Sequence, residues 1–384
     1  MKFPRLPVCA AMAAAALTLS LLVPSLASAQ GLTYQGQQGE SAGSSVQEQM
    51  PPAPEHPKIN DVKRGKAKPK AAAAARAPQP TESAAEAVIP PAQCAGRADV
   101  LGTSRTIVIG APNGLEVGLK TYPRTLKLED HEVVLTFDDG PLPETTGKVL
   151  DALHAQCVKA TFFMIGQNAA AHRQLVKREI REGHTVGHHT WSHPSITMRG
   201  LSDQAARADI AKGIAADEHA GYLDPAPADK PHVPFFRFPG FADTKPLLSW
   251  LASQKIAVFG ADLWASDWLD MTPDAELKLI MSRLDEAKRG IILFHDSRAS
   301  TAAMLPDFLR ELKARNYRVV HIEPGETAPE LEDAKPGWTS ETEATVGRVL
   351  SKLLSPAKVE STRRKWQPAR AGAKDSERLS KPSD

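Results

Sequence analysis

The chain is poor in cysteine and in net charge, and it has no long apolar run beyond its first residues. Its 384 residues carry 47 Lys and Arg against 45 Asp and Glu, a formal net charge of +2. This near-balance gives no reason to expect strong attraction to nucleic acid or to an anionic surface. The chain shows no internal repeat, and its length allows one large domain or two ordinary ones.

The apolar run at the N-terminus covers about residues 8–23 and follows two basic residues. Pro24 interrupts the run, which is short for a spanning helix, and residues 27–29 read Ala-Ser-Ala, an A-x-A cleavage pattern. The pattern predicts a secretory signal peptide over 1–29. The mature protein would then be periplasmic or extracellular, with no membrane span. An uncleaved N-terminal anchor is the alternative.

Only three cysteines are present, and Cys9 would be lost with the signal peptide. Cys94 and Cys157 would remain as an even pair in an oxidising compartment, where disulfides form and persist. We therefore expect a bridge between them. Two unpaired thiols, with Cys157 buried on the inner face of a helix, are the alternative.

Composition divides the rest of the chain. Gln, Gly, Ser, Pro, Ala and Lys dominate residues 30–93, which cannot bury enough apolar surface to offset ordering entropy, so a disordered linker is expected. Residues 94–131 include one strand-like run and are expected to pack on the main domain. The catalytic domain is expected over 132–323, and 324–384 is a polar tail. We expect this tail to be mostly disordered, with one short helix near 346–354.

The region 132–323 holds strand-like runs separated by helical patterns. Most of these runs are almost continuously apolar, as in parallel strands covered on both faces. Polar residues end at least five of them, and a barrel collects strand ends onto one face. We predict an α/β fold, a distorted (β/α) barrel of about seven strands, with a doubly wound open sheet as the alternative. The runs are 132–137, 160–165, 184–188, 233–238, 256–261, 290–295 and 317–322.

Carboxylates and imidazoles follow two of these runs in a pattern that suits a metal site. Asp138 and Asp139 end the first run, where a turn can aim both side chains into one cavity, although Asp-Gly-Pro is also ordinary turn chemistry. His189 and His193 would share one face if their segment formed a helical turn. Imidazole plus carboxylate suits zinc and several other divalent ions, whereas histidines of a polar surface are the plainer interpretation.

Three further polar residues accompany the later runs. Arg237 lies inside an apolar run, so its guanidinium needs an anionic partner, and a structural ion pair would satisfy it. Asp267 precedes Trp268, with Asp262 as a second carboxylate nearby, and His295 ends the sixth run. Each has an ordinary structural explanation alone. The ordered set favours hydrolysis of an amide or ester on a metal.

Five motifs contain these residues and resemble those of the polysaccharide deacetylases, carbohydrate esterase family 4. That family includes chito-oligosaccharide, chitin and peptidoglycan N-deacetylases. The resemblance covers roughly 132–322, about half of the chain, and implies a distorted (β/α) barrel that releases acetate from an N-acetylated glycan. The motifs are TFDDGP at 136–141, HTWSHP at 189–194, RFP at 237–239, DW at 267–268, and Ile291, Leu293 and His295.

The resemblance implies a metal site and a general base. Asp138 matches the base that activates water, and Arg237 matches the arginine that holds and tunes it. Asp139, His189 and His193 match the ligands of one divalent ion, zinc in the first place, with cobalt, nickel or manganese as alternatives.

The resemblance also implies the acid and the substrate contacts. His295 matches the general acid, Asp267 the carboxylate that tunes it, and Leu293 the wall of the acetyl pocket. Trp268 is expected to contact substrate. The family's third motif usually continues Pro-Tyr-Gly, and here Gly240 takes the place of the Tyr, whose backbone N–H serves the oxyanion.

Two other functions remain open at this point. The same scaffold could remove O-acetyl groups from a polysaccharide such as acetylated xylan. It could also be an inactive glycan-binding protein of the cell envelope. All three interpretations expect a glycan partner and no nucleic acid.

Overall fold

The computed structural model describes Cys94, residues 96–195 and residues 197–353. The expected signal peptide over 1–29, the expected linker over 30–93 and the end of the polar tail lie outside the described residues. Within the described part, every helix is too short or too polar to traverse a lipid bilayer.

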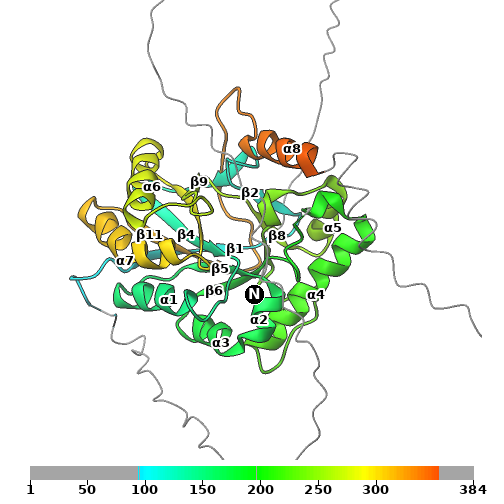
Figure 1. Cartoon of the computed structure of the whole chain (residues 1–384), viewed down its shortest axis with the longest axis horizontal. Coiled ribbons are helices and arrows are strands. Elements are labelled where there is room, and N and C mark those ends of the chain that lie inside the picture. The colour runs from blue at the N-terminus through cyan, green and yellow to red at the C-terminus, as the bar shows by residue number, and fades with distance from the viewer. Residues whose placement is uncertain (1–93, 95, 196, 354–384) are drawn as a thin grey trace, which may run out of the picture. The chain divides into compact units, whose positions relative to one another are not determined.

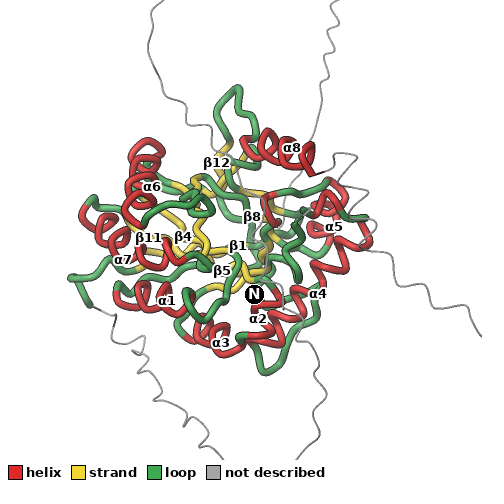
Figure 2. Tube along the Cα trace, in the orientation of Figure 1, coloured by secondary structure: helices red, strands yellow, loops and turns green. Residues whose placement is uncertain are grey.

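Strands form the centre of the fold and helices surround them (Figures 1 and 2). The strands are β1 (Thr103–Ile109), β2 (Leu115–Val117), β3 (Arg124–Leu126), β4 (Glu132–Asp138), β5 (Thr161–Met164), β6 (Thr185–His188), β7 (Phe235–Phe236), β8 (Ala257–Phe259), β9 (Leu263–Trp264), β10 (Gly290–His295), β11 (Arg318–Pro324) and β12 (Leu331–Asp333). The helices are α1 (Thr146–Ala155), α2 (Gly166–Ala171), α3 (Arg173–Arg181), α4 (Asp203–Gly221), α5 (Lys245–Ser253), α6 (Pro273–Ala287), α7 (Ala299–Ala314) and α8 (Glu341–Leu353), with 3₁₀ turns η2 (Met198–Gly200) and η3 (Pro239–Phe241).

The main sheet curls into an irregular parallel barrel. Its strand order is β1-β11-β4-β5-β6-β7-β8-β2, while β10 pairs with both β4 and β9. All of these pairings are parallel. β8 and β9 follow one another in sequence but pair with different strands, so the ring is interrupted there among the described residues. The predicted distorted (β/α) barrel is confirmed, and the open doubly wound sheet is excluded.

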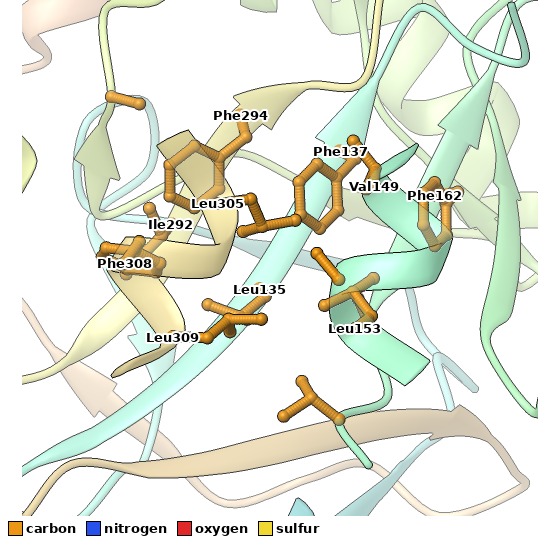
Figure 3. Close-up of a cluster of buried hydrophobic side chains, with 14 of the residues drawn as sticks. Leu135, Phe137, Val149, Leu153, Phe162, Ile292, Phe294, Leu305, Phe308 and Leu309 are labelled. Carbon is orange, nitrogen blue, oxygen red and sulfur yellow. The ribbon is translucent and has the colours of Figure 1, made fainter. Parts of the chain in front are cut away.

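Two apolar layers on opposite faces of the strands set the register. On β4, Leu135 and Phe137 point outward into the layer that α1 and α7 cover, whereas Val134 packs inside the barrel. The Phe137 ring lies 5.2 Å from that of Phe162 and 5.5 Å from that of Phe294 (Figure 3). Because side chains alternate along a strand, Thr136 and Asp138 on either side of Phe137 must point to the inner face of the barrel.

The segment before β4 is part of the barrel sheet, which goes beyond the expected packing of 94–131 on the domain. β1 pairs along β11 from Thr103 opposite Val319 to Ile109 opposite Pro324. β2 pairs with β8. The segment therefore supplies strands instead of a separate covering layer.

The expectation of a mostly disordered tail is wrong for its first part. β12 pairs antiparallel with β3, and α8 begins before the short helix that the sequence indicated. Figure 2 shows β12 and α8 at the same side of the fold. Trp338 Nε1 donates to the Leu119 carbonyl at 2.7 Å, and the hydroxyls of Thr121 and Thr342 lie 3.0 Å apart. Such long-range polar contacts order a segment that has few apolar residues, and composition cannot reveal them.

A disulfide joins Cys94 to Cys157 in the structure, with an S–S distance of 2.06 Å. Cys157 lies just after α1 and not within a helix. The bridge ties the start of the described chain to the turn that follows the first barrel helix.

Candidate active site

Residues from all five motifs meet at one end of the barrel. Asp138 is the last residue of β4, and His295 is the last residue of β10. His189 follows β6, Arg237 follows β7, and Asp267 lies in the loop after β9. The carboxyl ends of parallel barrel strands share one face, which is where such residues form active sites.

Arg237 lies inside the barrel and anchors Asp138. Its side chain is 0% exposed, and its Nη1 donates to Asp138 Oδ1 at 2.7 Å. Its Nε and Nη2 donate to the carbonyls of Phe259 and Gly260 at 3.2 and 2.8 Å. A buried guanidinium requires a paired charge, which Asp138 supplies. The other carboxylate oxygen, Asp138 Oδ2, lies 3.8 Å from His189 Nε2.

Asp139, His189 and His193 converge beside this pair. Asp139 Oδ1 lies 3.7 Å from His189 Nε2 and 3.5 Å from His193 Nε2. The helical turn expected for 189–193 is wrong, because the segment is a loop with positive φ of 69° at Thr190 and 45° at His193. The His193 N–H donates to Thr190 Oγ1 at 3.0 Å. Loop geometry, instead of helical periodicity, brings the two rings together.

The protonation states of these groups suit a metal ligand set. His189 Nδ1 lies 2.8 Å from the Arg237 carbonyl, so Nδ1 carries the hydrogen and Nε2 keeps its lone pair. Burial lowers the pKa of His189 to about 4, although the charges of Asp138 and Asp139 oppose it. Burial alone would raise the pKa of Asp139, but electrostatic interactions with His193, His295 and His189 lower it to about 2. His189 is therefore a neutral imidazole, and Asp139 is a carboxylate.

The three groups fit one divalent ion. Asp139 Oδ1 is buried and has no hydrogen-bond partner among the described residues. The three ligand atoms lie within 4.8 Å of one another. Two ligands of a tetrahedral zinc ion, each about 2.05 Å from it, are about 3.3 Å apart. That spacing is close to the 3.5 and 3.7 Å between these atoms, so the three side chains fit such an ion.

Asp267 holds and charges His295. Asp267 Oδ1 lies 2.7 Å from His295 Nδ1, and its Oδ2 accepts the His295 backbone N–H at 2.6 Å. Burial would lower the pKa of His295, but Asp267 most of all, with Asp139 and Asp138, raises it to about 9. The ring is therefore an imidazolium at neutral pH. Of the two ring nitrogens, Asp267 accepts only from Nδ1, so the proton on Nε2 is free to be donated to another group.

An apolar cluster adjoins His295. It contains Leu293, Phe241 and Trp264, and Trp268 packs against it. The Trp268 ring lies 5.9 Å from the His295 ring. Both indole N–H groups are buried without a partner among the described residues. The sequence analysis did not identify Phe241 and Trp264 as site residues. The only sequence feature that pointed to them was their position close to a motif.

Gly240 lies in a backbone conformation that favours glycine. Its φ is 57° and its ψ 20°, a left-handed conformation that glycine adopts without a steric penalty. Its N–H makes no hydrogen bond within the described part of the chain, whereas the next N–H, of Phe241, donates to Phe238. The Gly240 N–H is therefore available to a ligand.

The turn that carries Asp139 is held by residues that the motifs did not identify. Asp139 has a φ of 79°, and Asn168 Nδ2 donates to its carbonyl at 2.7 Å. Asp296 Oδ1 accepts the Gly140 N–H at 2.9 Å. A Cβ on Gly140 would lie 1.9 Å from the Asp296 carboxylate, so only glycine fits. The adjacency of Asp296 to His295 was the single sequence signal.

Asp262, the other carboxylate near the fourth motif, has a structural position. It accepts hydrogen bonds from the N–H groups of Leu119 and Ile291 and from Thr125 Oγ1, at 2.8, 2.7 and 2.8 Å. These bonds connect the segment around β2 and β3 to β10. Asp267 is therefore the carboxylate that joins the site.

Several proteins with similar sequences are named as deacetylases of glycans. A peptidoglycan N-acetylglucosamine deacetylase of Bacillus cereus is 33% identical over 199 residues, covering 50% of this chain and 85% of its own. A chitooligosaccharide deacetylase of Sinorhizobium fredii is 32% identical over 178 residues, covering 46% and 77%. A peptidoglycan N-acetylglucosamine deacetylase of Listeria monocytogenes is 32% identical over 192 residues. The chain spans only 38% of that relative's length.

A solved structure and a family model agree with these relatives. A peptidoglycan deacetylase of Bdellovibrio bacteriovorus matches with a TM-score of 0.52 and 28% identity, over 60% of this chain and 61% of that one. The polysaccharide deacetylase family model matches residues 125–249, which include the first three motifs and the Asp138–Arg237 pair. The chain therefore belongs to the polysaccharide deacetylase family.

Proposed function

We propose that the protein removes acetyl groups from N-acetylated glycans that contain N-acetylglucosamine, releasing acetate. The observation that carries this proposal is the meeting of three units at one end of the barrel. These units are the Asp138–Arg237 pair, the three possible metal ligands, and the His295–Asp267 pair. The names of the relatives support the class of substrate.

In this proposal Asp138 is the general base. Arg237 occupies Oδ1, so the proton of the attacking water goes to Oδ2, the oxygen that lies near His189. The ion pair also keeps the carboxylate from rotating away. Positioned proton transfer of this kind typically contributes about 10²–10⁴ in rate.

His295 is the general acid. It holds its proton at neutral pH because Asp267 raises its pKa to about 9. Its Nε2 donates that proton to the amine nitrogen as the C–N bond breaks, so the glycan leaves as a free amine. Leu293, with the aromatic cluster beside it, would contact the acetyl methyl group, and Trp268, which packs against that cluster, would contact substrate.

Asp139, His189 and His193 would hold one divalent ion, with zinc the first candidate from the donor set. When bound, such an ion polarises the acetamido carbonyl and lowers the pKa of water. The Gly240 N–H donates to the developing oxyanion, a contact typically worth about 10²–10³ in kcat. The glycine at this place keeps the donor although the family's usual side chain is missing.

We also propose that the chain is exported and that its catalytic domain covers 132–323. Support for export comes from the N-terminal pattern and from relatives whose named substrate is peptidoglycan. β1, β2, β12 and α8 lie outside those bounds but belong to the folded unit. A deletion to 132–323 should therefore be less stable than the longer protein, as thermal unfolding would measure.

The test is acetate release from three substrates side by side. These are an N-acetylated chito-oligomer, peptidoglycan glycan strands and acetylated xylan. Each assay is run with protein as purified, after chelation, and after return of zinc, cobalt, nickel or manganese. We expect acetate and free amine from an N-acetylated substrate, lost on chelation and restored by one of the ions.

Each remaining outcome has a clear meaning. Acetate from xylan alone would replace the proposal with O-deacetylation. No acetate from any substrate, with retained binding to an immobilised glycan, would show an inactive glycan-binding protein. Full activity after exhaustive chelation would refute the metal requirement.

A further inference from the structure

A buried carboxyl group, Glu276, lies behind the His295–Asp267 pair. It lies in the first turn of α6, whose N-cap residue Thr272 accepts the Ala275 N–H with its hydroxyl oxygen. The Glu276 side chain is fully buried in the protein. No motif of the sequence includes it, and the catalytic roles above do not use it.

One hydroxyl connects Glu276 to Asp267. Thr301, in the first turn of α7 and fully buried, places its Oγ1 2.7 Å from Asp267 Oδ2 and 2.9 Å from Glu276 Oε1. Asp267 in turn lies 2.7 Å from His295 Nδ1. The four side chains therefore form one continuous hydrogen-bond chain from α6 to the end of β10.

A count of hydrogens decides the direction of this chain. The Thr301 hydroxyl has one hydrogen and stands between two carboxyl oxygens, so it can donate to only one of them. Its bond to the other exists only if that carboxyl group is protonated and donates. Asp267 already accepts a backbone N–H and the imidazole N–H of His295, which suit a carboxylate. The protonated group must therefore be Glu276.

Two independent features agree with this assignment. Glu276 Oε2 has no hydrogen-bond partner among the described residues, and a buried carboxylate oxygen without a donor is costly. Burial raises the pKa of Glu276 and the charge of Asp267 adds to this, while Thr301, Ser300 and His295 oppose it, leaving a value of about 7.

We propose that Glu276 is a positioning residue that remains a neutral acid. It donates to Thr301, so that Thr301 donates to Asp267 and holds Asp267 as the charged partner of His295. Glu276 touches no reacting atom and acts through two other side chains. The proposal rests on the proposed role of His295 as the acid of the deacetylation.

The first experiment compares variants that keep or remove the donors of the chain. Glu276→Gln keeps a donor, because an amide N–H can replace the acid O–H, whereas Glu276→Leu removes it at similar size. Thr301→Ser keeps the hydroxyl, and Thr301→Val removes it. We expect kcat/KM on an N-acetylated oligomer to stay within about twofold for Gln and Ser. It should fall by about 10-fold or more for Thr301→Val, because this variant removes a hydrogen bond to the charged Asp267. It should fall by several-fold for Glu276→Leu.

The pH profile separates this role from a structural one. Replacing a neutral acid with an amide changes no charge, so the kcat/KM profiles of Glu276→Gln and wild type should coincide at pH values below the Glu276 pKa of about 7. A difference between the two profiles below that pH, in protein that folds and holds metal, would mean that Glu276 is not a neutral donor and refute the proposal. Equal activity of Thr301→Val and Thr301→Ser, with matching thermal unfolding and metal content, would refute it as well.

A second experiment does not depend on activity. Infrared difference spectra of wild type minus Glu276→Gln, taken below pH 7, should contain the C=O stretch of a protonated carboxylic acid, with the expected shift in D₂O. A difference spectrum that contains only carboxylate bands would overturn the proposal. If no substrate is deacetylated, the proposed function fails, and this spectrum still decides the state of Glu276.

Discussion

The charge of Asp267 should set the pH at which activity is lost on the alkaline side. Asp267→Asn removes that charge but keeps the shape of the side chain. The pKa of His295 is about 9 against an ordinary 6.5. At 1.36 kcal/mol per pKa unit, this difference corresponds to about 3 kcal/mol favouring the imidazolium.

Asp267 is the largest contributor that raises this pKa, while burial opposes it and Asp139 and Asp138 remain in the variant. We therefore expect the pKa of His295 to fall by about two units in Asp267→Asn. The imidazolium would then be lost at lower pH, so the alkaline limb moves downward. At a pH of about 8, the protonated fraction would fall from about nine-tenths to about one-tenth.

The assay is kcat/KM against pH for both proteins on one soluble N-acetylated oligomer. Asp270→Asn is the matched control, because Asp270 is exposed in the same loop, three residues away. Its profile should coincide with that of the wild type. The acidic limb should not move in either variant. An alkaline limb that stays in place in Asp267→Asn, in protein that folds and holds metal, would show that Asp267 does not tune the acid.

Three further predictions concern the base, the metal and the disulfide. Asp138→Asn should lower kcat by about 10²–10⁴ while keeping the metal, and near-full turnover would remove Asp138 as the base. His193→Ala should lose the bound ion by elemental analysis, and stoichiometric metal in this variant would exclude His193 as a ligand. Exported protein, denatured without reductant, should show no free thiol at Cys94 or Cys157. Reduction should cost up to about 4 kcal/mol of unfolding free energy for a separation of 63 residues on the chain-entropy model, as denaturant titration would measure.

Sequence patterns predicted the barrel because its strands carry their own signal. Runs such as β4 and β10 are apolar on both faces, and that property is local to each run. The patterns failed where order comes from distant partners. β12 and α8 have few apolar residues, and their place depends on contacts with β3 and with the segment around Leu119.

The identity and order of the site residues were determined by the sequence alone. Asp138 directly follows one apolar run and His295 ends another, so a parallel barrel must bring them to one face. The need of Arg237 for an anionic partner also follows from its place in an apolar run, and the family resemblance named Asp138 as that partner.

Only the tertiary structure decided how these groups are oriented and supported. The rings of His189 and His193 converge through a left-handed loop that no helical or strand periodicity encodes. Thr301 lies 34 residues from Asp267 and 25 residues from Glu276, so their hydrogen bonds exist only because α6 and α7 pack together. The formation of a hydrogen bond depends on distances of a few tenths of an ångström between elements, and the linear chain carries no signal of that kind.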